Sequence, residues 1–162
     1  DRHFPPLGSP LLLSELLSTE RVRVPLGSHS KADLLRELVR LALDQADDET
    51  VSGVVSAVEA REAQGTTAMG GGLAVPHGRT DLVSDLRLSA GLVRGVQDYR
   101  GPDGTPVAVA FLVLTPQHEM GKHVKVLARI ARLMHSATER AALLSSSTVE
   151  EFLGTVRRSE PA

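Results

Sequence analysis

Between positions 30 and 65 the apolar residues recur at intervals of three and four, which predicts two amphipathic helices. The first begins at Ser30, because Ser30 and Asp33 resemble a capping box whose acid is one carbon shorter than the usual Glu. The second begins at the acidic residues 47–49, where negative charge suits the positive end of the helix dipole, and it ends at Gly65. The predicted core positions are Leu34, Leu35, Leu38, Val39, Leu41, Ala42, Val51, Val54, Val55 and Val58.

Three other segments have the patterns of β-strands. Residues 21–25 alternate charged and apolar side chains, as a half-buried strand does, and Pro25 ends this strand or places it at a sheet edge. Residues 86–92 alternate as well. Residues 107–114 are continuously apolar, which predicts a strand buried on both faces. The turn cluster at 101–106 separates the last two.

The C-terminal third is predicted to be helical. One face of the long helix carries an apolar stripe that we expect to face the core: Val124, Leu127, Ala128, Ala131 and Met134. Another face carries a basic stripe that we expect to be solvated: Lys122, Lys125, Arg129 and Arg132. A last short helix covers residues 147–156, and the apolar segment 11–17 is expected to dock on the core.

These elements predict one α/β domain over residues 11–158, with a small mixed β-sheet flanked by α-helices. Residues 1–10 are rich in Pro and Gly and are predicted to form a flexible tail. No repeat or inter-domain linker interrupts the pattern. A chain of 162 residues is long enough for one domain with a substantial core.

Composition narrows the possible functions. The chain has no cysteine, which excludes disulfide frameworks, cysteine nucleophiles, iron–sulfur clusters and thiolate zinc sites. A net charge of −2 with three Phe, one Tyr and no Trp argues against nucleic-acid binding. The apolar run 107–114 is far too short to cross a bilayer, and residues 1–10 lack the pattern of a signal peptide. We therefore expect a cytoplasmic protein that does not insert into membranes.

Common catalytic motifs are missing or incomplete. His118 and His123 are five residues apart rather than four, and no carboxylate lies at a matching offset, so a metal site is a weak interpretation. No G-x-S-x-G motif is present. The glycine-rich residues 65–72 lack both the G-K-[ST] ending of a P-loop and the G-x-G-x-x-G order of a dinucleotide-binding turn.

His77 remains as the candidate for chemistry, because it follows the glycine-rich turn and lies between Pro76 and Gly78. Spacing alone favours an ordinary loop histidine over a nucleophile. The other histidines that match no motif are interpreted as surface residues: His3, His29, His118 and His135.

Several motifs together change that interpretation. Residues 61–77, REAQGTTAMGGGLAVPH, resemble the hallmark of the fructose/mannitol-type EIIA domains of the bacterial sugar phosphotransferase system. Residues 99–107, YRGPDGTPV, resemble the aromatic-x-x-x-D-G-x-P-V turn of the same family. FLVLTP at 111–116 and HVKVLA at 123–128 resemble two further segments in the same order. The resemblance covers roughly residues 11–157.

The resemblance implies a role for four residues. His77 would accept a phosphoryl group from phospho-HPr and pass it to a cysteine of an EIIB domain, a role that suits a neutral imidazole. His123 would be a second active-site histidine, near a helix start that favours anionic oxygens. Arg61 would offset charge on the phosphoryl oxygens. Thr67 would donate a hydrogen bond to His77 or to the phosphoryl group. No cofactor or metal is implied.

Two other functions remain open at the level of sequence. Relatives of the nitrogen-regulatory EIIA type act as phosphorylation-dependent binding modules, and they share the motifs around His77. A degenerate domain without phosphoryl transfer is the third possibility, against which the intact set Arg61, Thr67, His77 and His123 argues. Exposed strand edges also allow a homodimer.

Overall fold

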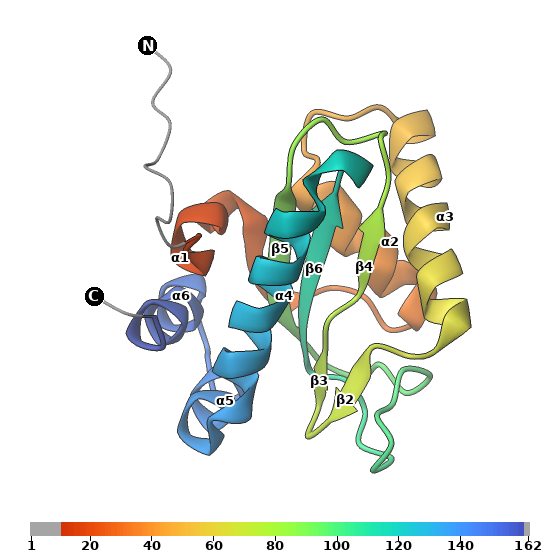
Figure 1. The fold of residues 1–162 in the computed structure, drawn as a ribbon. Helices are drawn as coiled ribbons and strands as arrows, with labels where there is room; N and C mark the ends of the chain where they lie inside the picture. The colour runs from red at the N-terminus through yellow and green to blue at the C-terminus, as the bar shows by residue number, and fades with distance from the viewer. Residues whose placement is uncertain (1–10, 161–162) are drawn as a thin grey trace.

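A mixed six-stranded sheet forms the centre of the structure, a computed structural model that describes residues 11–160 (Figure 1). The tail predicted for residues 1–10 lies outside the described residues. The strands are β1 (Val22–Leu26), β2 (Ala68–Gly70), β3 (Leu73–Ala74), β4 (His77–Arg79), β5 (Arg87–Val93) and β6 (Val109–Thr115). Their order is β1-β5-β6-β3-β2. Strand β4 lies outside this order and pairs with residues 113–115 of β6, C-terminal to residues 109–110, with which β3 pairs.

Strand β6 organises the sheet. It runs antiparallel to β5 and parallel to both β3 and β4, while β1 is parallel to β5, so the predicted mixed sheet is confirmed. All of its residues are buried, as predicted for a strand covered on both faces. Strand β1 lies at the edge of the sheet, one of the two outcomes predicted from Pro25, and its pairing with β5 is irregular between Arg23 and Leu26.

Helices cover both faces of the sheet (Figure 1). They are α1 (Leu13–Leu16), α2 (Lys31–Ala42), α3 (Asp48–Gln64), α4 (Met120–His135), α5 (Ala137–Leu144) and α6 (Val149–Arg158), with short 3-10 turns at Thr19–Arg21 and Gln117–Glu119. Alternate side chains of β6 define two cores. Leu112 and Leu114 pack with α2 and α3, whereas Phe111 and Val113 pack with α1, α4, α5 and α6.

Local signals place the ends of α2 and α3. Ser30 Oγ accepts a hydrogen bond from the backbone N–H of Asp33, and an Asp47 oxygen accepts one from that of Thr50. Gly65 follows the last residue of α3, as predicted. The two predicted helices, the cap at Ser30 and the stop at Gly65 are therefore confirmed, and the structure adds a cap at Asp47.

The face of α4 that packs on the sheet differs from the prediction. Its buried residues are His123, Val126, Ile130, Leu133 and Met134. Of the stripe predicted to face the core, only Met134 is buried; Val124 is 57% exposed, and Ala128 and Ala131 are exposed as well. Two apolar stripes lie side by side on this helix, and helical spacing alone does not decide which one the sheet covers.

A loop at residues 97–107 supports the hairpin formed by β2 and β3. An Asp103 oxygen accepts a hydrogen bond from the N–H of Gly71 at the hairpin tip. A side chain at Gly101 would place its Cβ 2.4 Å from the backbone nitrogen of Gly70, so only glycine permits this approach. The hairpin leads directly into β4 and His77. Among the described residues, no helix combines the length and apolarity needed to cross a bilayer.

Candidate functional site

His77 is the first residue of β4, and its imidazole is oriented by the backbone. Its Nδ1 lies 2.9 Å from the carbonyl oxygen of Val75. Because a carbonyl oxygen only accepts hydrogen bonds, this contact assigns the proton to Nδ1 and leaves the lone pair on Nε2. In the neutral form of this half-buried ring, Nε2 is therefore free to act as a nucleophile.

His123 lies in the first turns of α4 and packs against His77. The ring centroids are 5.4 Å apart in an edge-to-face arrangement. His123 is only 5% exposed, and its Nδ1 is 2.8 Å from the hydroxyl oxygen of Thr115 on β6. Burial is the main cause that lowers the pKa of His123 to about 4, and the nearby His77 and Arg79 lower it further. This imidazole is therefore neutral at physiological pH.

Arg61 shares a cavity with His77. It belongs to the last turn of α3, and its Nη1 donates a hydrogen bond to the carbonyl oxygen of Gly65 at 2.8 Å. The cavity measures about 240 Å³ and is lined by Arg61, Thr66, Thr67, Met69, Val75, His77, Leu127 and Ala131. One guanidinium and one imidazole therefore face a hollow with a mainly apolar rim, which suits an anionic group carried by a larger partner.

Of the two hydrogen bonds predicted as alternatives for Thr67, the one to His77 is not formed, and the one to a phosphoryl group stays a prediction. The Thr67 hydroxyl makes hydrogen bonds with the Glu62 carboxylate and, at 2.7 Å, with the Tyr99 hydroxyl. The predicted hydrogen bond from Thr67 to His77 is therefore not formed. The physical reason is that Glu62 is a buried carboxylate, which attracts the nearest hydroxyl more strongly than a neutral imidazole does.

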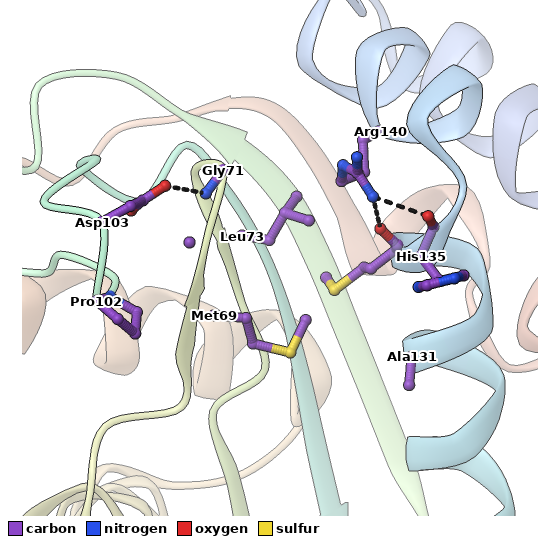
Figure 2. Close-up of a pocket in the computed structure, with 10 residues that line it drawn as sticks. Met69, Gly71, Leu73, Pro102, Asp103, Ala131, His135 and Arg140 are labelled. Carbon is purple, nitrogen blue, oxygen red and sulfur yellow. Dashed lines mark hydrogen bonds between the residues drawn. The ribbon is translucent and has the colours of Figure 1, made fainter.

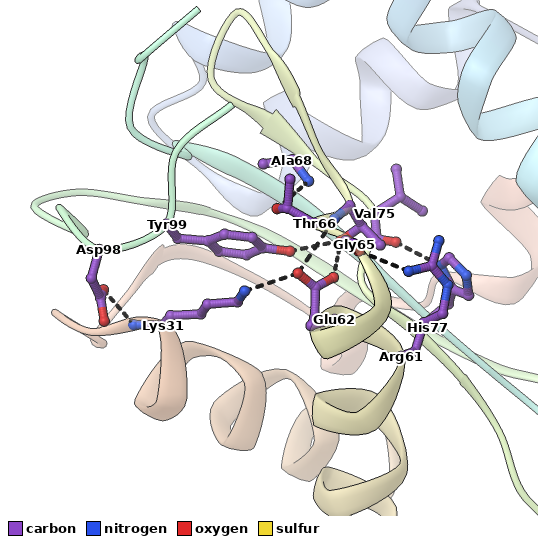
Figure 3. Close-up of polar contacts among 11 residues, drawn as sticks. Lys31, Arg61, Glu62, Gly65, Thr66, Ala68, Val75, His77, Asp98 and Tyr99 are labelled. Atoms are coloured by element: carbon purple, nitrogen blue, oxygen red, sulfur yellow. Dashed lines mark hydrogen bonds and ion pairs between the residues drawn. The ribbon is translucent and has the colours of Figure 1, made fainter. Parts of the chain in front are cut away.

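Sequence reasoning missed Lys31, Glu62 and Tyr99. Lys31 Nζ lies 3.0 Å from Glu62 Oε1, and the same ammonium lies 4.5 Å from the centre of the Tyr99 ring (Figure 3). Glu62 and Tyr99 belong to the motifs that carry the family resemblance, but sequence alone did not indicate that their side chains meet. Three of the histidines interpreted as surface residues, His29, His118 and His135, are exposed, and His3 lies outside the described residues.

A second hollow adjoins the His77 cavity, and Figure 2 shows the residues that line it. It measures about 510 Å³ and shares Met69 and Ala131 with the first, so the two together form a groove between the β2–β3 hairpin and α4. Arg140 at its far end donates hydrogen bonds to the carbonyl oxygens of Met134 and His135. Within residues 11–160, no group of three or more His, Asp or Glu side chains is arranged to hold a metal ion.

Comparison with known proteins identifies relatives over most of the chain. The family model described as "Phosphoenolpyruvate-dependent sugar phosphotransferase system, EIIA 2" matches residues 15–158. A nitrogen regulatory protein of Bradyrhizobium diazoefficiens is 36% identical over 123 residues, which cover 75% of this chain and 79% of the relative. The fructose-specific EIIABC component of Bacillus subtilis is 24% identical over 149 residues, and the match covers 91% of this chain but 23% of that longer protein.

Solved structures have the same fold. The nitrogen regulatory protein IIA-Ntr of Neisseria meningitidis superposes with a TM-score of 0.78 at 28% identity, covering 88% of this chain and 97% of that one. The mannitol IIA of Escherichia coli superposes with a TM-score of 0.70 at 18% identity, covering 86% and 97%. At 18% identity the second comparison concerns the fold alone.

Proposed function

The chain belongs to the EIIA 2 family of the phosphoenolpyruvate-dependent sugar phosphotransferase system, and on this premise we propose that it is a cytoplasmic phosphocarrier. In this proposal residues 11–158 are the functional domain. His77 accepts a phosphoryl group from phospho-HPr and passes it to an EIIB domain. The observation that carries the proposal is the hydrogen bond between His77 Nδ1 and the Val75 carbonyl, which leaves Nε2 as the nucleophile.

The transfer is a substitution at phosphorus. The Nε2 lone pair of His77 forms a new N–P bond while the N–P bond of the donor phosphohistidine breaks, and the donor imidazole leaves. His77 keeps its Nδ1 proton throughout, and the Val75 carbonyl stabilises the positive charge that develops on the ring. In the second step a cysteine thiolate of EIIB attacks phosphorus, and the N–P bond of His77 breaks.

The neighbouring side chains suit the charge of the transferred group. In the proposal Arg61 offsets negative charge on the phosphoryl oxygens from within the same cavity. In the proposal the Thr115 hydroxyl donates to His123 Nδ1, so the neutral His123 carries its proton on Nε2. This N–H donates a hydrogen bond to a phosphoryl oxygen. Thr67 contributes by holding Val75 in place: its carbonyl oxygen accepts a hydrogen bond from the N–H of Val75, whose own carbonyl oxygen accepts the one from His77 Nδ1.

The exposed apolar stripe of α4 supports a protein as the phosphoryl donor. Leu127 and Ala131 line the His77 cavity, and Val124 continues the same face with 57% of its surface exposed. Met69, 47% exposed, lies on the opposite side of that cavity. Exposed apolar side chains around a polar centre are typical of protein interaction sites.

The proposal is tested by the mass of the intact protein after incubation with phosphoenolpyruvate, enzyme I and HPr. Wild type is expected to gain one phosphoryl group, and His77→Ala none. The exposed His29 provides the matched control, and His29→Ala is expected to be labelled like wild type. Labelling that persists in His77→Ala would refute His77 as the acceptor.

A second candidate function is a regulatory one, favoured by the 36% identity to a nitrogen regulatory protein. In that case phosphorylation of His77 controls binding to a partner rather than sugar uptake. The two functions separate when the phosphorylated protein is mixed with an EIIB domain. Rapid loss of the phosphoryl group to the EIIB cysteine supports the carrier. Retention of the group, with binding of a partner that depends on phosphorylation, supports the regulator.

A further inference from the structure

Glu62 is a buried carboxylate that the proposed transfer does not use. Its side chain is 4% exposed and lies 3.0 Å from Lys31 Nζ. It also accepts hydrogen bonds from the backbone N–H of Thr67 at 3.3 Å and from the Thr67 hydroxyl. Burial of a carboxylate is unfavourable unless it is paired and hydrogen-bonded, and here cation, amide and hydroxyl meet that requirement together.

The direction of the hydrogen bonds follows from the groups involved. A carboxylate only accepts, so the Thr67 hydroxyl donates to Glu62. The Thr67 oxygen then accepts from the Tyr99 hydroxyl at 2.7 Å. Burial raises the pKa of Tyr99, so its phenol stays protonated and remains the donor. Tyr99, Thr67 and Glu62 therefore form one directed chain that ends beside Lys31.

The same threonine holds the backbone that orients His77. The carbonyl oxygen of Thr67 accepts a hydrogen bond from the N–H of Val75 at 3.2 Å. The carbonyl oxygen of Val75 in turn accepts the bond from His77 Nδ1 at 2.9 Å. A shift of Thr67 therefore moves Val75, and with it the group that fixes the tautomer of His77.

We propose that Glu62, together with Tyr99 and Lys31, is a positioning residue that acts through Thr67 and Val75 to keep the His77 lone pair on Nε2. The inference deepens the proposed function and rests on it for its effect on transfer rate. The geometry of the unphosphorylated ring can be tested separately, because the tautomer is observable without any donor protein.

The variants Glu62→Gln, Tyr99→Phe and Thr67→Val each remove one link with little change of shape. Thr67→Ser keeps the hydroxyl and is the conservative rescue. Glu37 offers a matched control elsewhere, because its half-buried carboxylate also accepts from a backbone N–H (Gly27) and a hydroxyl (Ser28) and pairs with a cation, Arg23. Glu37→Gln thus removes a comparable structural carboxylate that is not connected to His77 by these bonds.

Two measurements follow for each variant: the ¹⁵N shifts of the His77 ring, which report the tautomer, and the rate of phosphoryl transfer from phospho-HPr. We expect wild type, Thr67→Ser and Glu37→Gln to keep the proton on Nδ1. We expect Glu62→Gln, Tyr99→Phe and Thr67→Val to show a mixture of tautomers and a transfer rate about tenfold lower, since small misplacements of a reacting group have large effects on rate.

A purely structural role predicts a different result. Glu62→Gln, Tyr99→Phe and Thr67→Val would then lower the melting temperature as Glu37→Gln does, with the wild-type tautomer and rate, and this result would overturn the inference. If wild type is not phosphorylated at all, the proposed function fails instead. The tautomers alone then decide the positioning: a mixture in those three variants supports it, and unchanged Nδ1 protonation overturns it.

Discussion

The two imidazoles of the candidate site have different surroundings, which suit the different roles proposed for them. His77 is half-buried and has its proton placed on Nδ1 by a backbone carbonyl, which leaves Nε2 free for the proposed attack on phosphorus. His123 is buried against β6, and desolvation keeps it neutral, so in the proposed transfer it is not a competing cation beside the phosphoryl group. The burial of His123 depends on packing against β6, which sequence patterns do not reveal.

The low pKa of His123 predicts a dependence of stability on pH. Between the ordinary value of 6.5 and about 4, the unfolded chain binds a proton at this position that the folded protein does not bind. The free energy of unfolding therefore falls as pH decreases through this window, by up to about 3 kcal/mol for this residue. Denaturant unfolding of wild type and His123→Gln at several pH values measures the difference.

Carboxylates that titrate in the same window contribute equally to both proteins and cancel in the comparison. We expect the stability of His123→Gln to depend less steeply on pH between 6.5 and 4 than that of wild type. Parallel profiles for the two proteins would show that His123 binds protons in the folded state as readily as in the unfolded chain.

Arg61 is predicted to act on the transfer rate. Its guanidinium lies at the cavity of His77, and its hydrogen bond to Gly65 orients it at the end of α3. We expect Arg61→Gln to slow phosphoryl transfer about ten- to a hundredfold, because hydrogen bonds to charged groups contribute about 1.5–3 kcal/mol. The rate is measured by mixing the protein with phospho-HPr, quenching the reaction at set times and quantifying the phosphorylated protein.

Arg40 provides the matched control for this prediction. It lies in the last turn of α2, as Arg61 does in α3, and pairs with Asp48 on the surface. Arg40→Gln is expected to keep the wild-type transfer rate. Equal transfer rates for Arg61→Gln and wild type would contradict a role of Arg61 in phosphoryl transfer.

Among the elements, α2 and α3 were predictable because their signals are local. The caps at Ser30 and Asp47 and the stop at Gly65 lie next to the helices that they bound. The buried face of α4 was not predictable in the same way, since two apolar stripes share the helix and only the position of the sheet selects one. The stripe left outside is the one that borders the site.

That exposed stripe predicts a docking effect. Val124→Glu places a charge on a surface that a protein partner would cover, and burial of an unpaired charge is unfavourable. We expect the KM for phospho-HPr to rise about tenfold or more with little change in stability. Transfer rates measured over a range of HPr concentrations separate KM from kcat.

Leu144 is the matched control for Val124, because it is also an exposed apolar residue, 39% accessible, and does not line the His77 cavity. Leu144→Glu is expected to keep the wild-type KM. Identical KM values for Val124→Glu and wild type would contradict docking on this face of α4.

The complete fold joins two cores through one sheet. The α/β class and the mixed sheet were predictable from strand and helix patterns, but the pairing of β4 with β6 was not, because it connects residues that are distant in sequence. That pairing brings His77 beside Val113, two residues before Thr115, the partner of His123. The site is thus a consequence of topology, which explains why Glu62 and Tyr99 also escaped prediction.

The C-terminal helix is predicted to stabilise this arrangement without entering the site. Phe152 of α6 is fully buried, and its ring centre lies 5.7 Å from that of Phe111 on β6. We expect Phe152→Ala to lower the free energy of unfolding by about 3–5 kcal/mol, because it leaves a cavity in the core. Urea unfolding measures the loss, and a change below about 1 kcal/mol would contradict the packing described.

The position of the phosphoryl group within the His77 ring is the decisive measurement. Long-range ¹H–¹⁵N correlation spectra of the phosphorylated, ¹⁵N-labelled protein identify the nitrogen bonded to phosphorus. The hydrogen bond from Nδ1 to the Val75 carbonyl predicts a phosphoryl group on Nε2 of His77 with the proton retained on Nδ1. A phosphoryl group on Nδ1 of His77, or on any other residue, would contradict this account.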